Sequence, residues 1–154
     1  MEFLVPLTCK EGSKNNPYAR FNMQVDATFT ANIGLVAQFL PFNPETTEAT
    51  RAVFLKRARL NSWDDLSIRG EARTQAKAAF KTALTSLAQL FMFHDTGPYL
   101  EGIEANYADL IVGGWLNMLS VTMPQEEWSD FRTWHGGVFA RLHDALQKNY
   151  FKCS

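Results

Sequence analysis

The sequence of 154 residues is poor in the features that mark several classes of protein. Its two cysteines, Cys9 and Cys153, lie near opposite ends, with no His or Cys at the spacing of metal ligands. This argues against a disulfide-rich scaffold and favours free thiols, and we expect no metal site. No apolar run approaches the ~20 residues that a membrane-spanning helix needs. We therefore expect a cytoplasmic protein that does not contact a membrane.

An excess of charge of one sign is missing as well. The chain has 15 Lys and Arg against 16 Asp and Glu, and no basic stripe, which argues against a nucleic-acid partner. What the chain does contain is 46% hydrophobic residues, ample for a single core. We expect one domain over residues 17–154, preceded by an N-terminal arm over residues 1–16 that carries Pro6 and Gly12.

Apolar residues recur every three or four positions through most of the chain, and this spacing predicts helices. The first is expected over about residues 17–40, and the second has Asn43 as its N-cap and Pro44 at its first position. A third, over about residues 68–93, is expected to bury a face that includes Ala72, Ala79 and Ala83. Three more follow over about 106–121, 125–132 and 137–150. No segment alternates like a strand, so the sequence predicts an all-α, single-domain bundle of about six helices.

Residues 100–119 are the most informative stretch. Asn106 can accept a hydrogen bond from the amide of Asp109, and the Asp109 carboxylate can accept one from the amide of Asn106. This is a capping box with Asn and Asp in place of Ser or Thr and Glu. The helix that follows is apolar on nearly every face, which is typical of a helix in the centre of a domain. Asp109 is therefore expected to be a buried structural residue.

The order of several motifs resembles the C-terminal helical domain of glutathione transferases, most closely fungal glutathione-transferase-like proteins. The resemblance covers about residues 17–150. Within it, Gly102, Asn106 and Asp109 match the family's capping box. It rests further on Thr50-Arg51 with Phe54, Trp63-Asp64-Asp65-Leu66, Gly97-Pro98-Tyr99, Gly114-Trp115-Leu116 and Trp134-His135-Gly136-Gly137. It implies an all-helical fold and a pocket for an apolar co-substrate.

The resemblance places that pocket between the first helix and the middle of the central one. The ligand-binding residues carried over are Tyr18, Phe21, Asn22, Val25, Trp115, Met118 and Leu119. A wall of aromatic and Met side chains suits a planar or polyene ligand. In the family, the conventional glutathione site belongs to a thioredoxin-like domain built on a βαβ unit. The first 16 residues of this sequence contain no βαβ pattern. We therefore expect no cofactor, with glutathione possible only at a site of another kind.

Two alternative functions stay open at this point. A glutathione-independent cyclase, isomerase or dehydratase of fungal specialised metabolism would need an imidazole to move protons, and His94 and His135 are weak catalytic candidates. His143, beside Asp144, is expected to be solvated. The other alternative is a protein-interaction or oligomerisation module, because a face left without the thioredoxin-like domain would expose apolar surface to a homo-oligomer or a partner subunit.

Overall fold

The computed structural model describes residues 17–151, and over that range the chain is all-α, as predicted, with no strand. Its helices are α1 (Pro17–Ala31), α2 (Thr47–Ala58), α3 (Gly70–Ala83), α4 (Thr85–Met92), α5 (Tyr107–Thr122), α6 (Gln125–Phe131) and α7 (Val138–Asn149). The described residues also contain four short 3-10 turns, η1 (Ile33–Leu35), η2 (Ala37–Phe39), η3 (Trp63–Leu66) and η4 (Trp134–Gly137). Among the described helices, none is long and apolar enough to cross a membrane. Cys9, Cys153 and the expected arm lie outside the described residues.

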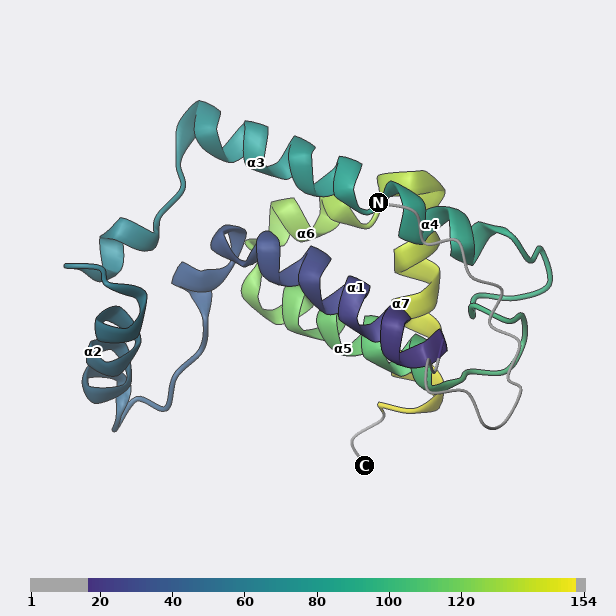
Figure 1. Cartoon of the computed structure of the whole chain (residues 1–154), viewed down its shortest axis with the longest axis horizontal. Helices are drawn as coiled ribbons and strands as arrows, with labels where there is room; N and C mark the ends of the chain where they lie inside the picture. The colour runs from purple at the N-terminus through teal and green to yellow at the C-terminus, as the bar shows by residue number, and fades with distance from the viewer. Residues whose placement is uncertain (1–16, 152–154) are drawn as a thin grey trace.

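Helix α5 lies at the centre of the bundle, as the capping box predicts. It packs against α1 on one side and α7 on the other, and α3 and α4 run across the top of the view in Figure 1. Contact with α7 is close at Gly113, where a Cβ atom would stand 2.3 Å from Leu146 Cδ1. The neighbouring Gly114 faces open space. The two adjacent glycines thus have different roles, and only Gly113 is required by the packing.

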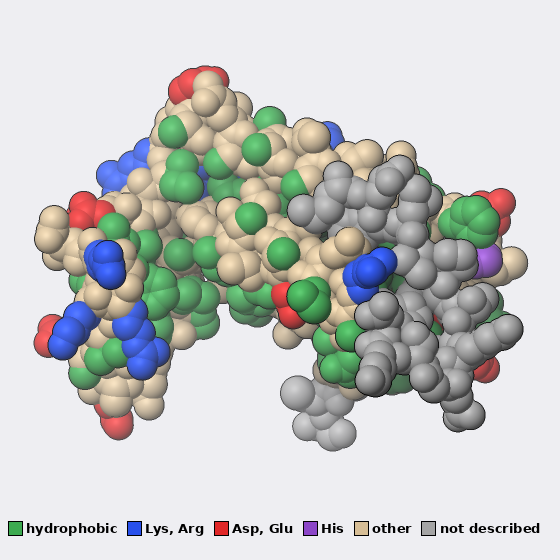
Figure 2. Space-filling model, in the orientation of Figure 1, with side chains coloured by type: hydrophobic (Ala, Val, Ile, Leu, Met, Phe, Trp, Pro, Cys, Tyr) green, Lys and Arg blue, Asp and Glu red, His purple; other side chains and the backbone are tan. Residues whose placement is uncertain are grey.

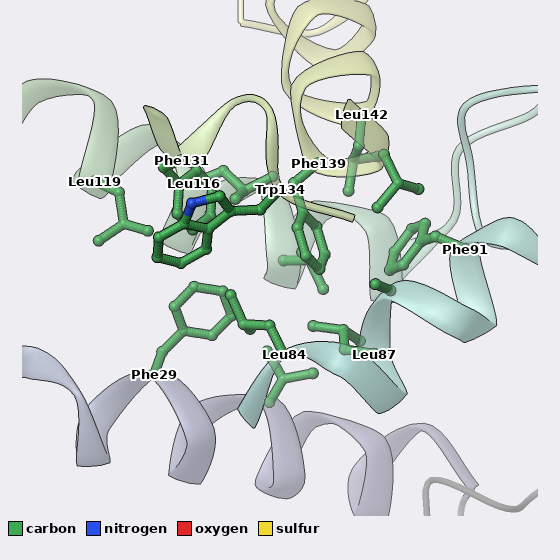
Figure 3. Packing of buried hydrophobic residues seen from close by; sticks show 14 of the residues in the cluster. Phe29, Leu84, Leu87, Phe91, Leu116, Leu119, Phe131, Trp134, Phe139 and Leu142 are labelled. Carbon is green, nitrogen blue, oxygen red and sulfur yellow. The ribbon is translucent and has the colours of Figure 1, made fainter. Parts of the chain in front are cut away.

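The core forms where α1, α4, α5, α6 and α7 converge. Phe29 of α1 points toward Leu84 and Trp134 in Figure 3, with Phe131, Phe139 and Leu142 on the opposite side. The largest fully buried side chains include Phe29, Phe80, Phe131, Phe139, Leu84, Leu87, Leu116, Leu142 and Leu146. Burial of each such side chain contributes roughly 1.5–3 kcal/mol. This core fixes the relative positions of α1 and α5.

The first helix is shorter than predicted. It ends at Ala31, and η1 and η2 replace its expected continuation to residue 40. The Asn32 side chain donates to the Thr28 carbonyl oxygen over 2.8 Å and so occupies one of the acceptors at the helix end. A Cβ on Gly34 would lie 3.2 Å from Ile68 Cδ1. Gly34 therefore packs closely against Ile68, in a segment distant along the chain. The spacing of apolar residues cannot predict such a contact.

The predicted third helix is two helices. The break falls at Leu84, a fully buried residue with φ −82° and ψ −5°. After it, Leu87 and Phe91 of α4 are buried in the core, and α4 packs against α7. Before it, Phe80 is the only buried residue of α3, and the alanines expected to be buried, Ala72, Ala79 and Ala83, are exposed. The turn at Leu84 lets the two halves face different partners.

Helix α3 is held to the bundle by a polar clamp. The Arg73 guanidinium donates to both carboxylate oxygens of Glu127 in α6, over 2.7 and 2.6 Å, and to the Leu35 carbonyl over 2.9 Å. Lys77 Nζ lies 3.7 Å from the same carboxylate. Hydrogen bonding from Arg73 lowers the pKa of Glu127 below its usual range. A bidentate, largely buried pair of this kind is stronger than a surface ion pair.

Helix α2 begins later than predicted. Asn43 accepts a hydrogen bond on Oδ1 from the amide of Glu45 over 3.0 Å, and its carbonyl accepts one from Thr46. Asn43 thus organises a turn, in which Pro44 lies, and the α-helix starts only at Thr47. Asn and Pro are as common in turns as at helix starts, so the local pattern fits both. In Figure 1, α2 lies at the far left, apart from the other helices.

Candidate functional site

The candidate site is the edge along which α1 meets α5, and Trp115 is its central side chain. Its ring stacks on Phe29 with 5.2 Å between the ring centroids and 11° between the planes. Its indole Nε1 donates to Asp26 Oδ1 over 2.8 Å. Trp115 is therefore fixed on one face by a buried ring and at its polar end by a carboxylate. The remainder of the side chain is only partly buried.

The seven residues predicted to bind ligand divide into two groups. Phe21, Val25 and Leu119 are buried, with 5%, 0% and 3% of their surface exposed. They belong to the core beneath the site and offer at most its floor. The partly buried group, which retains surface for a ligand, consists of Tyr18, Asn22, Trp115 and Met118. Their role in binding stays a prediction.

Asn22 supplies a polar atom with unused hydrogen-bonding capacity. Its Oδ1 is buried and has no hydrogen-bond partner among residues 17–151. Asn22 lies one turn before Asp26 on α1, on the same edge of the helix. A buried acceptor without a partner costs about 1–3 kcal/mol, which a donor on a bound molecule would recover. Within the described part of the chain, the α1–α5 edge therefore combines a partly exposed indole, a thioether and one unused carbonyl oxygen.

The α5 capping box has the predicted geometry. Asp109 is fully buried, and its carboxylate accepts hydrogen bonds from the amides of Leu100, over 2.7 Å, and Asn106, over 2.8 Å. Asn106 Oδ1 in turn accepts from the amides of Ala108 and Asp109. Burial raises the pKa of Asp109 although the two amide donors act in the opposite direction. The box fixes the start of the helix that carries Trp115 and Met118.

The two histidines predicted as weak catalytic candidates form no hydrogen bond with α1 or α5 among the described residues. His135 adopts a left-handed conformation with φ 50°, and its Nε2 donates to the Lys81 carbonyl over 2.8 Å, linking η4 to the end of α3. His94 is exposed in the loop after α4, with its ring edge-on to Phe93. In residues 17–151, neither imidazole donates to a carboxylate that would orient it. No group of three His, Cys, Asp or Glu there is arranged to hold a metal ion.

His143 is not solvated, contrary to expectation. Its side chain is 11% exposed, and its ring packs edge-on against Trp128 of α6 with 5.2 Å between centroids. Asp144, beside it, is 59% exposed and accepts both guanidinium donors of Arg132. Burial lowers the pKa of His143. The expectation was wrong because α6 covers this part of α7, and the local sequence contains no sign of that contact.

Asp26 is the site residue whose part the sequence did not reveal. Its partner Trp115 is 89 positions away, and only the parallel packing of α1 and α5 brings the two together. A carboxylate on an amphipathic helix is ordinarily read as solvated. The one sequence signal was the presence of polar residues on a helix with an otherwise apolar stripe.

Comparison with known proteins identifies the family. The model of the glutathione S-transferase C-terminal domain family matches residues 28–150. This chain belongs to that family. The resemblance inferred from the capping box and its flanking motifs is therefore confirmed, and α5 is the capped central helix of a glutathione S-transferase C-terminal domain. A search of curated protein sequences finds no match.

A solved structure agrees with this assignment. The chain superposes on a glutathione S-transferase of Ceriporiopsis subvermispora, crystallised in complex with glutathione, with a TM-score of 0.76 and 22% identity. The match covers 89% of this chain and 57% of that one, so the chain spans a little over half of that transferase. At this identity the likeness shows the shared fold of the glutathione S-transferase C-terminal domain.

Proposed function

We propose that this domain binds an apolar small molecule along the α1–α5 edge, beside Trp115. The observation that carries the proposal is the way Trp115 is held. Phe29 and Asp26 fix the indole in one orientation while part of its ring stays accessible. A rigid aromatic surface loses little conformational entropy when a planar ligand stacks on it.

The composition of the edge supports the same proposal. Met118 adds an adaptable thioether, and the buried Oδ1 of Asn22 offers one acceptor for a hydroxyl or amine on the ligand. Sites for small molecules are mostly apolar with a few polar anchors. Membership of the glutathione S-transferase C-terminal domain family favours this location, because the resemblance places the co-substrate pocket on these two helices.

The test is a titration with the amphiphilic aromatic dye 8-anilinonaphthalene-1-sulfonate, monitored through the indole 1H–15N resonances of the four tryptophans. The Trp115 resonance is assigned by its loss in Trp115→Phe. We expect a saturable shift of this resonance, while that of Trp134, which is 3% exposed, stays in place. Comparable shifts of all four resonances would indicate nonspecific binding and contradict the proposal.

A matched pair of substitutions locates the dye. Met118→Ala removes a side chain of the edge and is expected to weaken binding about tenfold, which corresponds to about 1.4 kcal/mol. Met23→Ala removes the same side chain from a position on α1 that is 73% exposed, and it should leave the affinity unchanged. Equal effects of the two substitutions would place the ligand elsewhere.

A further inference from the structure

The α2 unit, residues 42–66, has few contacts with the bundle. Helix α2 has no buried residue. Its inner side packs on Trp63 through Phe54, at 5.6 Å between centroids, and through Arg51, whose guanidinium lies 4.7 Å from the ring. Trp63 Nε1 donates to the Gln38 carbonyl over 3.2 Å. Most helices of this length depend on tertiary packing of one face, and α2 contributes no buried residue to such packing.

The outer face of α2 is basic. Lys56, Arg57 and Arg59 are exposed, and none of them forms an ion pair within residues 17–151. Val53, one turn earlier, is 54% exposed. Figure 2 shows basic side chains gathered on the α2 unit at the left of the molecule. The last turn of α2 and its C-cap residue Arg59 therefore present three cations that form no ion pair within the described residues, beside an exposed aliphatic side chain.

The complementary charge lies in the same chain. Residues 82–131 contain seven Asp and Glu and no Lys or Arg. Three of those carboxylates, Asp95, Glu101 and Glu104, are exposed in the loop between α4 and α5. The same loop region exposes Phe93 by 81% and Ile103 by 74%. We call residues 93–104 the acidic loop.

The α2 unit and the acidic loop lie at opposite ends of the longest axis of the molecule (Figure 1). They cannot pair within one chain, but they can pair between two. We propose that α2 of one copy docks on the acidic loop of a second copy, so that the chain associates head to tail. The cations of the last α2 turn meet the loop carboxylates, and Val53 meets the exposed apolar side chains of the loop.

The charge pattern favours a second copy over a polyanion. Glu45, Glu48, Asp64 and Asp65 balance the four basic residues of the α2 unit, so the unit as a whole has no net positive charge to attract an extended polyanion such as nucleic acid or an acidic membrane, and its local group of cations fits only a small acidic surface. The acidic loop, by contrast, offers a small number of carboxylates that matches the number of free cations. A head-to-tail contact uses two different surfaces, so it forms rings or open chains rather than a two-fold dimer.

A charge-swap experiment tests the proposal. Variant A is Lys56→Glu with Arg57→Glu, and variant B is Asp95→Lys with Glu104→Lys; all four side chains are exposed, and far-UV circular dichroism verifies that each variant is folded. Sedimentation velocity measures mass at about 20 mM and about 500 mM NaCl, where the Debye length is ~20 Å and ~4 Å. We expect the wild type to associate at low salt, with affinity falling at least about tenfold at high salt.

Mixing the two variants gives the decisive result. Variants A and B should each be monomeric, because in each variant the net charge of the C-terminal end of α2 and the net charge of the acidic loop have the same sign. An equimolar mixture should associate again, as should the combined four-substitution variant. The control Arg20→Glu with Lys148→Glu alters exposed cations outside α2 and should associate like the wild type.

Three outcomes would overturn the proposal. The first is a wild type that stays monomeric at low salt, and the second is a mixture of A and B that does not associate. The third is salt-sensitive binding of monomeric wild type, but not of variant A, to heparin or to phosphatidylserine vesicles, which would assign α2 to a polyanionic partner. None of these outcomes bears on dye binding at the α1–α5 edge, so the two proposals can fail separately.

Discussion

Replacing Asp109 with Ala should destabilise the domain substantially. The carboxylate is fully buried and accepts two amide hydrogen bonds, from Leu100 and Asn106. Alanine would leave both donors without a partner at the start of the central helix. The substitution therefore affects the α4–α5 loop and the first turn of α5 together.

The magnitude follows from these two bonds. A hydrogen bond to a charged group contributes about 1.5–3 kcal/mol, so the pair contributes roughly 3–6 kcal/mol. Burying the carboxylate opposes this, as its raised pKa shows. We expect a net loss of about 3 kcal/mol in the free energy of unfolding. For a chain of this size each kcal/mol lowers the melting temperature by about 2–4 °C, which gives a decrease of about 6–12 °C.

Urea denaturation followed by far-UV circular dichroism measures this loss, with Asp95→Ala as an exposed control that should cost less than about 0.5 kcal/mol. The pH dependence supplies a second test. Because the pKa of Asp109 is raised in the folded state, the native carboxyl takes up its proton before the unfolded one does. The difference between wild type and Asp109→Ala should therefore grow as the pH falls through that raised pKa. A loss below about 1 kcal/mol, or a difference that shrinks in acid, would refute this reasoning.

Three further predictions follow from burial and close contacts. Gly113→Ala should cost about 1–3 kcal/mol because its methyl group meets Leu146, whereas Gly114→Ala should stabilise by up to about 1 kcal/mol; urea denaturation that ranked them in the reverse order would be inconsistent with the α5–α7 contact. Glu127→Gln should have a lower free energy of unfolding than the wild type at neutral pH. This difference should disappear as the pH falls below 4.5 and through the lowered pKa of Glu127, because the carboxylate is then protonated and the ion pair with Arg73 is lost. The free energy of unfolding of the wild type should fall as the pH falls through about 6.5, because the buried imidazole of His143 resists protonation. His143→Gln should abolish this fall, and identical pH profiles of the two proteins would show that His143 takes no part.

The sequence predicted the elements whose causes are local. The start of α5 was predictable because Asn106 and Asp109 are three residues apart and satisfy each other's neighbouring amides. The break at Leu84 was not, since the apolar spacing continues through it and the cause is the different packing of α3 and α4. The exposed alanines of α3 have the same explanation. Periodicity shows that a residue is apolar, but not whether another helix lies opposite it.

The contact between α1 and α5 was predicted, whereas ligand binding along it stays a prediction. Trp115, Met118 and Asn22 lie where the family resemblance places them, on two helices that pack together. The orientation of the indole was not predictable, because Asp26 and Phe29 reach it only through the packing of α1 on α5. The burial of His143 depends in the same way on Trp128, from a different helix.

The isolation of the α2 unit has a consequence for local unfolding. Because none of its residues is buried, α2 can open at a cost well below that of global unfolding, and its amides should exchange with solvent long before those of α5. Trypsin would then cleave after Lys56, Arg57 or Arg59. The two pieces would remain joined by the Phe29–Trp115 stack and by the bond from Arg73 to Leu35. Helix α2 is therefore the place where this domain should tolerate a nick, new chain ends or an inserted sequence without loss of the bundle.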